Sequence, residues 1–320
     1  MDISFNTHPS NLSLTNGYGV AGYGMLVALK ELGHEVPFRS TTAPVEIAFC
    51  QPEWVTWSNP DAYHIQYTPW ESTGLPEGWL DHFNNNCDEI WTPSPLIAQW
   101  YRAAGVVKPV KVFQHGIDHV WSPRPEPVET SMLTFLHHGE PAPRKGGQMT
   151  VDAFTELFGG SPDHLLVVKA AGRAGIDTGG VKNIKVITRE MTQAELINLY
   201  QSVNAVVYPS YGEGFGLIPL QAMAAGVPTI CTEAWAPYSE FLIPELRLGS
   251  KLIDSPWPHI HPGMMLEPSY DDLITSMLSL EREETKHTSA ARANSIDIHR
   301  SYDWKRLTEQ AFEHIVERFG

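Results

Sequence analysis

A glycine-rich stretch with one acidic side chain is the part of this sequence best suited to chemistry. Residues 208–226 read YPSYGEGFGLIPLQAMAAG; Glu213 lies between glycines, and Pro219 lies where the first turn of a helix tolerates proline. The free N–H groups and the positive dipole end of such a helix form an anion site that suits a diphosphate. Glu213 could accept hydrogen bonds from sugar hydroxyls and stabilise positive charge that develops on the sugar ring. A surface turn with a helix-capping glutamate is the alternative explanation.

Two further features could serve the same anion site. Lys169 ends an apolar strand pattern at 165–169, and a lysine at the carboxyl end of a strand points toward a crevice rather than into the core. Snorkelling of this lysine from a buried strand edge is the alternative. Near the amino end, Gly17 and Gly19 lie in the loop NGYGVAG at 16–22, where glycine permits close backbone approach at a strand-to-helix turn. We expect this loop to contact donor phosphates or the acceptor.

Metal-binding patterns are missing from the sequence. No Asp-x-Asp occurs, and the histidines and cysteines do not have zinc spacing, so we expect a reaction that needs neither a metal ion nor another cofactor. The cysteines, Cys50, Cys87 and Cys231, are widely spaced and fit neither a disulfide framework nor a CxxC site. We expect them to be buried thiols.

Length and composition favour two globular domains. A chain of 320 residues with 42% hydrophobic and 18% charged residues can bury two cores, which excludes disordered, collagen-like and coiled-coil classes. The formal net charge is −15 and the first 120 residues are acidic on balance, so a DNA acceptor is possible but disfavoured. Because no apolar run could span a membrane and no secretory signal opens the chain, we expect a cytoplasmic protein.

Short apolar runs alternate with amphipathic stretches, which indicates parallel sheets covered by helices on both faces. In the first half, the pattern predicts helices at 20–32 and 95–104 and strands at 35–37, 45–49, 62–66, 89–92 and 110–113. In the second half, it predicts helices at 147–158 and 193–202 and strands at 133–136, 165–169, 184–187, 205–208 and 229–231. Two such halves predict paired Rossmann-like domains, whose ligands bind at the carboxyl ends of the strands.

The domain bounds follow from prolines and from the last helix. Three alternating prolines in WSPRPEP at 121–127 disfavour regular structure. We therefore predict an N-terminal acceptor domain at 1–122, a linker at 123–130 and a C-terminal donor domain at 131–300. Residues 301–320 should end the chain in a helix that packs back toward the N-terminal domain, because 304–319 places apolar side chains near one helical face.

Several ordered motifs resemble GT-B glycosyltransferases of the retaining GT4-like class, the glycosyl transferases group 1. They are GYG at 17–19, LGHEV at 32–36, WTPS at 91–94, HGID at 115–118, RKG at 144–146, EGFGL at 213–217 and AMAAGVP at 222–228. The resemblance covers essentially the whole chain. It implies an α/β GT-B fold with two Rossmann-like domains facing across a cleft, and metal-independent transfer of a sugar, with retention, from a nucleoside diphosphate sugar to a hydroxyl acceptor. The compact chain also looks like bacteriophage-encoded glycosyltransferases.

The resemblance also implies donor-binding roles. Lys145 matches the family lysine that neutralises the diphosphate, with Arg144 beside it, and Glu213 matches the acid that holds the sugar. Gln221 stands where the family has a second glutamate that binds the ribose, a task that a neutral amide can still perform. Glu140 replaces the usual arginine after the glycine. The remaining donor contacts would come from Gly214, Phe215, Gly216 and Leu217.

Contacts outside the diphosphate site are also implied. The base, expected to be that of UDP, would lie near Arg189 and Met191. The segment PWEST at 69–73 resembles one found in some members, in which Glu71 could orient an acceptor hydroxyl and Trp70 could stack on a sugar face, unless both are loop packing.

The identity of the acceptor is left open by the sequence. His64 is one more acceptor-side candidate, with the commoner role of a structural histidine as the alternative. For His115 the structural role is favoured, because this residue adjoins the hinge. A protein, glycan or small-molecule acceptor fits the acidic charge better than DNA. Because Gln221 and Glu140 depart from the family pattern, a catalytically silent sugar-nucleotide-binding homologue is an alternative function, as is an epimerase or phosphorylase of the same fold.

Overall fold

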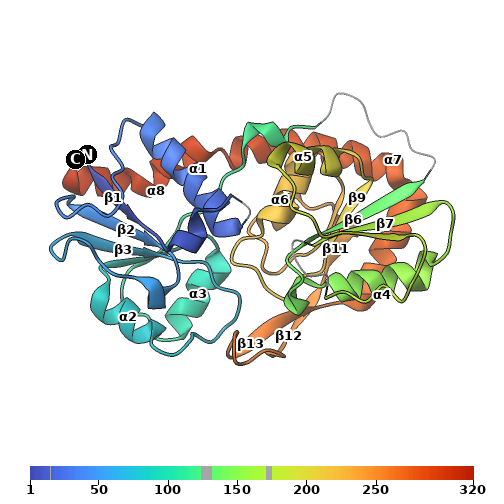
Figure 1. The fold of residues 1–320 in the computed structure, drawn as a ribbon, viewed down its shortest axis with the longest axis horizontal. Helices are drawn as coiled ribbons and strands as arrows, with labels where there is room; N and C mark the ends of the chain where they lie inside the picture. The colour runs from blue at the N-terminus through green and yellow to red at the C-terminus, as the bar shows by residue number, and fades with distance from the viewer. Residues whose placement is uncertain (15, 124–131, 171–174) are drawn as a thin grey trace.

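The computed structural model describes residues 1–14, 16–123, 132–170 and 175–320 and shows two α/β lobes side by side (Figure 1). All but the first residue of the linker predicted at 123–130 lies outside these ranges. Both chain ends lie on the first lobe. Among the described residues, no helix has both the length and the apolar character needed to cross a bilayer.

The first lobe contains a five-stranded parallel sheet in sequence order. Its strands are β1 (Ile3–Asn6), β2 (Val45–Phe49), β3 (Tyr63–Tyr67), β4 (Glu89–Thr92) and β5 (Val110–Val112). The strand predicted at 35–37 is an edge segment beside β1: the Ile3 N–H donates to the Glu35 carbonyl at 2.9 Å, and only isolated bridges form. β1 was not predicted, because Ser4 and Asn6 break the apolar pattern although both are fully buried.

Helices cover both faces of the first sheet. The helices are α1 (Gly17–Glu31) and α8 (Trp304–Phe319) on one face, and α2 (Trp79–Asn86) and α3 (Pro95–Ala103) on the other. Apolar side chains of the strands alternate between the two faces: Ile47 packs with α1 and α8, whereas Ile90 packs with α2 and α3.

The second lobe contains a six-stranded parallel sheet in the order β11-β10-β9-β6-β7-β8. Its strands are β6 (Leu133–Gly139), β7 (His164–Ala170), β8 (Ile184–Ile187), β9 (Ala205–Tyr208), β10 (Thr229–Thr232) and β11 (Arg247–Leu248). Its helices are α4 (Gly147–Phe158) and the first part of α7 (Tyr270–Ser301) on one face, and α5 (Gln193–Gln201) and α6 (Leu217–Ala224) on the other. Two parallel α/β lobes agree with the fold class predicted from the sequence.

A hairpin and several short helices complete the second lobe and its connections. The hairpin pairs β12 (Ser250–Asp254) with β13 (Met264–Pro268) and lies where the two lobes meet (Figure 1). The 3-10 helices are η1 (Pro9–Leu12), η2 (Pro52–Trp54), η3 (His119–Trp121), η4 (Pro143–Lys145), η5 (Ser239–Phe241) and η6 (Pro244–Leu246).

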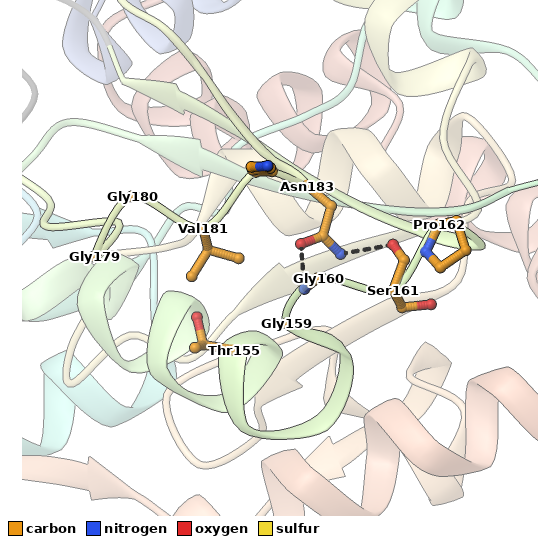
Figure 2. Close-up of a pocket in the computed structure, with 10 residues that line it drawn as sticks. Thr155, Gly159, Gly160, Ser161, Pro162, Gly179, Gly180, Val181 and Asn183 are labelled. Atoms are coloured by element: carbon orange, nitrogen blue, oxygen red, sulfur yellow. Dashed lines mark hydrogen bonds between the residues drawn. The ribbon is translucent and has the colours of Figure 1, made fainter.

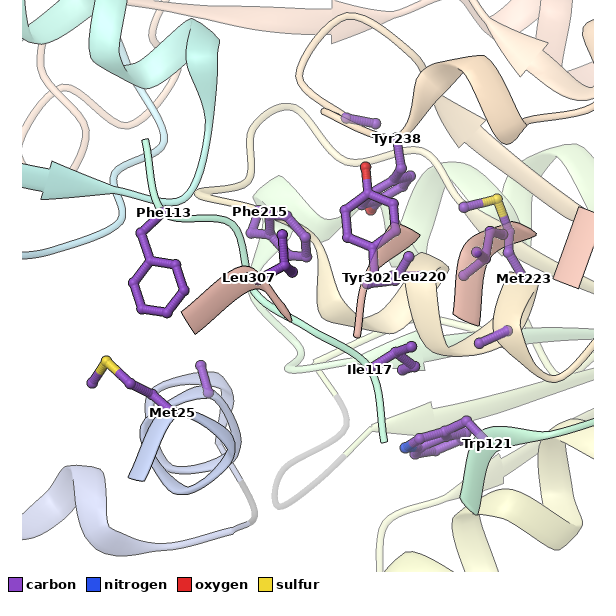
Figure 3. Packing of buried hydrophobic residues seen from close by; sticks show 14 of the residues in the cluster. Met25, Phe113, Ile117, Trp121, Phe215, Leu220, Met223, Tyr238, Tyr302 and Leu307 are labelled. Atoms are coloured by element: carbon purple, nitrogen blue, oxygen red, sulfur yellow. The ribbon is translucent and has the colours of Figure 1, made fainter. Parts of the chain in front are cut away.

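The two crossings between the lobes lie next to each other. The Ile117 N–H on the outgoing crossing donates to the Tyr302 carbonyl on the returning one at 2.7 Å. Around them, Phe215 and Leu220 of the second lobe belong to the same buried apolar cluster as Met25 of the first (Figure 3). One continuous core therefore joins the lobes at this hinge.

Candidate active site

The predicted glycine-rich loop meets the first lobe through its backbone. It follows β9, at the carboxyl edge of the second sheet, while residues 69–71 follow β3, at the carboxyl edge of the first. A Cβ on Gly212 would lie 2.3 Å from the Glu71 carbonyl oxygen, and one on Gly214 would lie 2.2 Å from the Pro69 Cβ. No side chain fits at either position, so glycine is what allows the two loops to touch on each side of Glu213.

A second glycine brings the basic segment to the same place. Gly146 has φ +74°, and a Cβ there would lie 2.1 Å from the Pro209 carbonyl oxygen. η4 therefore docks against the end of β9, where the Tyr211 N–H donates to the Arg144 carbonyl at 2.8 Å. This docking carries the side chains of Arg144 and Lys145 toward Glu213.

Glu213 is the centre of a buried polar cluster. The residue is only 7% exposed. Its Oε1 accepts hydrogen bonds from Lys145 Nζ at 2.5 Å, Tyr208 Oη at 2.9 Å, Ser210 Oγ at 2.9 Å and Arg144 Nη1 at 3.4 Å. All four contacts fall on one oxygen, and no described residue makes a hydrogen bond with Oε2. That second oxygen is the part of Glu213 that a ligand can use.

Burial and neighbouring charges shift the pKa values of Glu213, Lys145 and Arg144. Burial alone favours the neutral acid at Glu213, but the charges of Lys145 and Arg144 outweigh it and hold the pKa of Glu213 below its ordinary value. Burial lowers the pKa of Lys145, and the charge of Arg144 adds to that effect. For Arg144, burial is outweighed by the carboxylates of Glu71 and Glu213, which raise its pKa. The site thus holds an ionised acid among buried cations.

Arg144 connects the two lobes through this cluster. Its Nη2 lies 3.1 Å from Glu71 Oε1 on the first lobe, and its Nη1 donates to the Gly212 carbonyl at 3.0 Å. Both terminal nitrogens of the guanidinium therefore contact protein groups. Glu71, predicted to orient an acceptor, and Arg144, predicted to bind the donor, form an ion pair in this structure.

The start of α6 supplies further donors beside Glu213. Gly216 adopts φ +88° as the N-cap residue, and its carbonyl accepts from Tyr238 Oη at 2.6 Å. The next N–H groups, including that of Leu217, have no partner within the helix, as at any helix start. The Phe215 ring is buried in the core between the lobes, so only the backbone of Phe215 can contact a donor. Gln221 lies one turn along the helix on the half-exposed face of Leu217.

Lys169 lies on the same sheet edge but away from Glu213. It is 2% exposed, pairs in register with His138 on β6, and has its pKa lowered first by burial and then by the charge of Arg189. No described residue makes a hydrogen bond or ion pair with its ammonium group. Arg189 follows β8 and lies 2.8 Å from Glu195 at the start of α5, with Met191 half-buried beside it. These residues form a separate group on the α5 side.

The amino-terminal glycine loop offers fewer donors than predicted. Gly19 is packed against the Ser13 backbone, and its N–H donates to Asn16 Oδ1 at 2.8 Å in a helix cap. Its amide is therefore already used, which disagrees with a donor contact through that group. Gly17, by contrast, is the exposed first residue of α1. Among the described residues outside its own turn, no atom lies within 4 Å of the position that a Cβ would take.

Two acceptor-side predictions are corrected by packing. Trp70 is 7% exposed, packs against Trp79, and donates from Nε1 to the Gly74 carbonyl at 2.7 Å, so loop packing rather than sugar stacking explains it. His64 lies near the amino end of β3, the end opposite the carboxyl edge, with its ring stacked on Trp57. His64 therefore lies outside the site.

His261 is a site residue that the sequence reasoning missed. It precedes β13, is 6% exposed, and its Nδ1 lies 3.8 Å from Glu71 Oε2. Burial lowers its pKa, and the charges of Glu71, Arg144, Lys145 and Glu213 all reach it. No motif marks this histidine, because it is 190 residues from Glu71 in sequence.

One open pocket lies far from this cluster. It has a volume of about 540 Å³ and is lined by loops 159–162 and 179–183, which precede β7 and β8 at the amino edge of the second sheet (Figure 2). Its Asn183 side chain already bonds the Phe158 and Ser161 carbonyls and the Gly160 N–H. In the described parts of the chain, no group of three or more His, Cys, Asp or Glu side chains is arranged to hold a metal ion.

Part of the second lobe matches known proteins in sequence. Residues 176–246, which include the glycine-rich loop and α6, match the family model of the glycosyl transferases group 1. This part of the second lobe is therefore similar to that family. A D-inositol 3-phosphate glycosyltransferase of Corynebacterium jeikeium is 29% identical over 119 residues, 33% of this chain and 28% of that protein. The match thus spans little more than a quarter of the length of that relative.

Solved structures show the same fold over nearly the whole chain. Sucrose-phosphate synthase from Thermosynechococcus elongatus superposes with a TM-score of 0.73 at 13% identity, covering 99% of each chain. An Escherichia coli trehalose-6-phosphate protein bound with UDP-2-fluoro glucose superposes with a TM-score of 0.62 at 10% identity, covering 92% of this chain and 77% of the other. The chain therefore has the GT-B fold.

Proposed function

We propose that this protein is a retaining glycosyltransferase that moves a sugar from a UDP-sugar to a hydroxyl acceptor without a metal ion. The observation that carries the proposal is Glu213. It is ionised, buried where the lobes touch, and bonded to the protein through Oε1 alone among the described residues. A fixed carboxylate with one oxygen free can accept hydrogen bonds from a sugar and stabilise positive charge on the ring as the leaving group departs.

The anionic half of the donor would lie between Lys145 and the start of α6. Lys145 is held beside Glu213, and the unpaired N–H groups of α6 begin three residues further along the chain from that acid. A cation together with helix amides can stabilise a leaving diphosphate, which is the task that a metal ion performs in other transferases. Gln221 would bind the ribose one turn further along α6.

UDP is the proposed nucleotide, because a structure of the same fold holds UDP-2-fluoro glucose. Retention would follow if the acceptor hydroxyl attacks from the face that the diphosphate leaves, with a phosphate oxygen taking the hydroxyl proton. Glu71 would then be the acceptor-side carboxylate. The acceptor is proposed to be a protein, glycan or small molecule, because the chain carries a net charge of −15.

Nucleotide release and product stereochemistry test this function together. The protein would be incubated with UDP- and GDP-sugars of known anomeric configuration and with acceptor mixtures, and free nucleotide would be measured. Proton NMR of the product should show the donor's anomeric configuration. Inversion of that configuration would contradict the retaining mechanism.

The same assay separates the alternative functions. A silent sugar-nucleotide-binding protein would release no nucleotide with any acceptor, and Gln221 and Glu140 motivate that alternative. An epimerase would convert one sugar nucleotide into another without an acceptor, and a phosphorylase would require inorganic phosphate.

A further inference from the structure

His261 is a buried polar side chain that points at a charged group without bonding it. Its Nδ1 has no hydrogen-bond partner among the described residues, although it lies 3.8 Å from Glu71 Oε2. That distance exceeds a hydrogen bond by under about 1 Å, so a small movement would bring the two groups into contact. An unpaired buried nitrogen is costly, which suggests that it has a partner in another state of the site.

The backbone around His261 is held in place against the first lobe. The Thr73 N–H donates to the Met264 carbonyl at 3.0 Å, and the Gly74 N–H donates to the Pro262 carbonyl at 3.0 Å. A Cβ on Gly263 would lie 2.6 Å from the Gly74 nitrogen, so the contact tolerates only glycine. The backbone next to His261 is therefore fixed against the first lobe, and a small shift of the Glu71 side chain would bring its Oε2 within hydrogen-bond distance of Nδ1.

Glu71 lies between two possible partners. Its Oε1 is paired with Arg144 at 3.1 Å, and its Oε2 faces His261. Glu71, Glu213, Arg144 and Lys145 together carry no net charge. A bound diphosphate would add negative charge beside this balanced buried group, so the cations would be drawn toward the phosphates.

We propose that His261 takes over the Glu71 carboxylate from Arg144 when a donor diphosphate binds. Arg144 turns to the phosphates, and the His261 Nδ1–H donates to Glu71 Oε2. No proton is transferred and no covalent bond changes. His261 is then a positioning residue that keeps the Glu71 carboxylate fixed on the acceptor side, where its other oxygen can bind the attacking hydroxyl. This inference rests on the proposed function, because it needs a diphosphate ligand.

This exchange of the Glu71 partner from Arg144 to His261, called the handover here, can be observed on the histidine ring itself. The full chain would be labelled with ¹⁵N-histidine, its His261 signals identified by their loss in His261→Asn, and UDP added. The ring signals should shift in the direction of a hydrogen-bonded Nδ1–H. Uridine, which lacks phosphate, should leave them unchanged, and UDP should leave them unchanged in Glu71→Gln.

Variants add a readout that simple packing would not give. The amide nitrogen of asparagine can occupy the position of Nδ1, whereas that of glutamine corresponds to Nε2. We expect His261→Asn to keep most of the wild-type rate of UDP release from a UDP-sugar. In His261→Gln, that rate should fall about tenfold. His259→Ala, at an exposed neighbour in the same hairpin, should match the wild type.

A second measurement distinguishes failure of the handover from failure of the proposed function. Melting temperature with and without UDP reports nucleotide binding independently. If UDP raises the melting temperature but the His261 signals do not move, the handover is wrong and the proposed function stands. If UDP leaves the melting temperature unchanged, the proposed donor is wrong and the handover fails with it. Equal activity in the asparagine and glutamine variants would also overturn the handover.

Discussion

Several donors bind one oxygen of the Glu213 carboxylate, and the charges of Lys145 and Arg144 keep this buried carboxylate ionised. Glu213 and Lys145 could be chosen as candidate site residues from the sequence, because both lie in motifs within a few residues of the glycines that position them. The pairing of Arg144 with Glu71 could not be predicted, since 73 residues separate them. Nor does the sequence indicate that both terminal nitrogens of Arg144 contact protein groups.

The first prediction concerns Glu213. Glu213→Gln keeps the size of the side chain but removes the charge that would stabilise the sugar, so the rate of UDP release from a UDP-sugar should fall about 100- to 1,000-fold. Steady-state kinetics on the purified variant measures this. Glu317→Gln, an exposed change on α8, should behave as the wild type. A Glu213→Gln enzyme with half of the wild-type rate would remove this carboxylate from the mechanism.

The elements are predicted well where a segment is regular and poorly where tertiary contacts decide it. α4 and β2 have the bounds predicted from the sequence, and α8 starts three residues after the predicted start, because α7 extends to Ser301. The hairpin β12–β13 was missed, because its exposed Lys251 and Leu252 leave no clear alternation and its role depends on contact with Thr73. The loops at 69–71 and 212–214 touch each other but lie outside regular helices and strands. In the sequence, only the glycines of the second loop indicated a close backbone contact there.

A prediction at this scale concerns the contact between those loops. Gly214→Ala would place a Cβ 2.2 Å from the Pro69 Cβ, so the lobes must separate at Glu213. UDP release from a UDP-sugar should fall at least about tenfold while circular dichroism stays unchanged, because each lobe keeps its own sheet. Small-angle scattering should show a larger radius of gyration.

Gly175→Ala provides the matched control for this change. The nearest atom to its Cβ would be the Pro141 carbonyl oxygen at 3.9 Å, an ordinary contact. Its rate and radius of gyration should equal those of the wild type. An active, compact Gly214→Ala protein would show that close approach of the lobes is not required.

At the scale of the whole molecule, one aromatic core spans the hinge. His115 lies in it between Phe49 and Tyr67 of the first lobe and Phe215 of the second, and both of its ring nitrogens lack partners among the described residues. The sequence favoured a structural histidine here, and the burial agrees. The sequence could not predict how the lobes pack together or that His261 approaches Glu71. Both features depend on contacts between distant parts of the chain.

The His115 environment predicts an acid-dependent stability. Burial lowers its pKa from 6.5 to about 3, so below pH 6.5 the unfolded chain binds a proton that the folded one does not. Stability is therefore lost as pH falls from 6.5 toward 3, by about 1.4 kcal/mol per pH unit from this group. In His115→Phe, the free energy of unfolding should rise by about 1 kcal/mol at neutral pH and depend less on pH. Urea unfolding of both proteins between pH 7 and pH 4 measures this, and parallel pH curves would contradict it.

Lys145, Glu213 and the start of α6 are proposed to form a nucleotide-sugar site between the lobes. This site can be tested by titration calorimetry of UDP into the wild type and into Lys145→Met. We predict saturable one-to-one binding to the wild type and at least about tenfold weaker binding to the variant, because a buried cation that meets the diphosphate is lost. Equal affinity in the two proteins, or no binding to the wild type, would contradict the account.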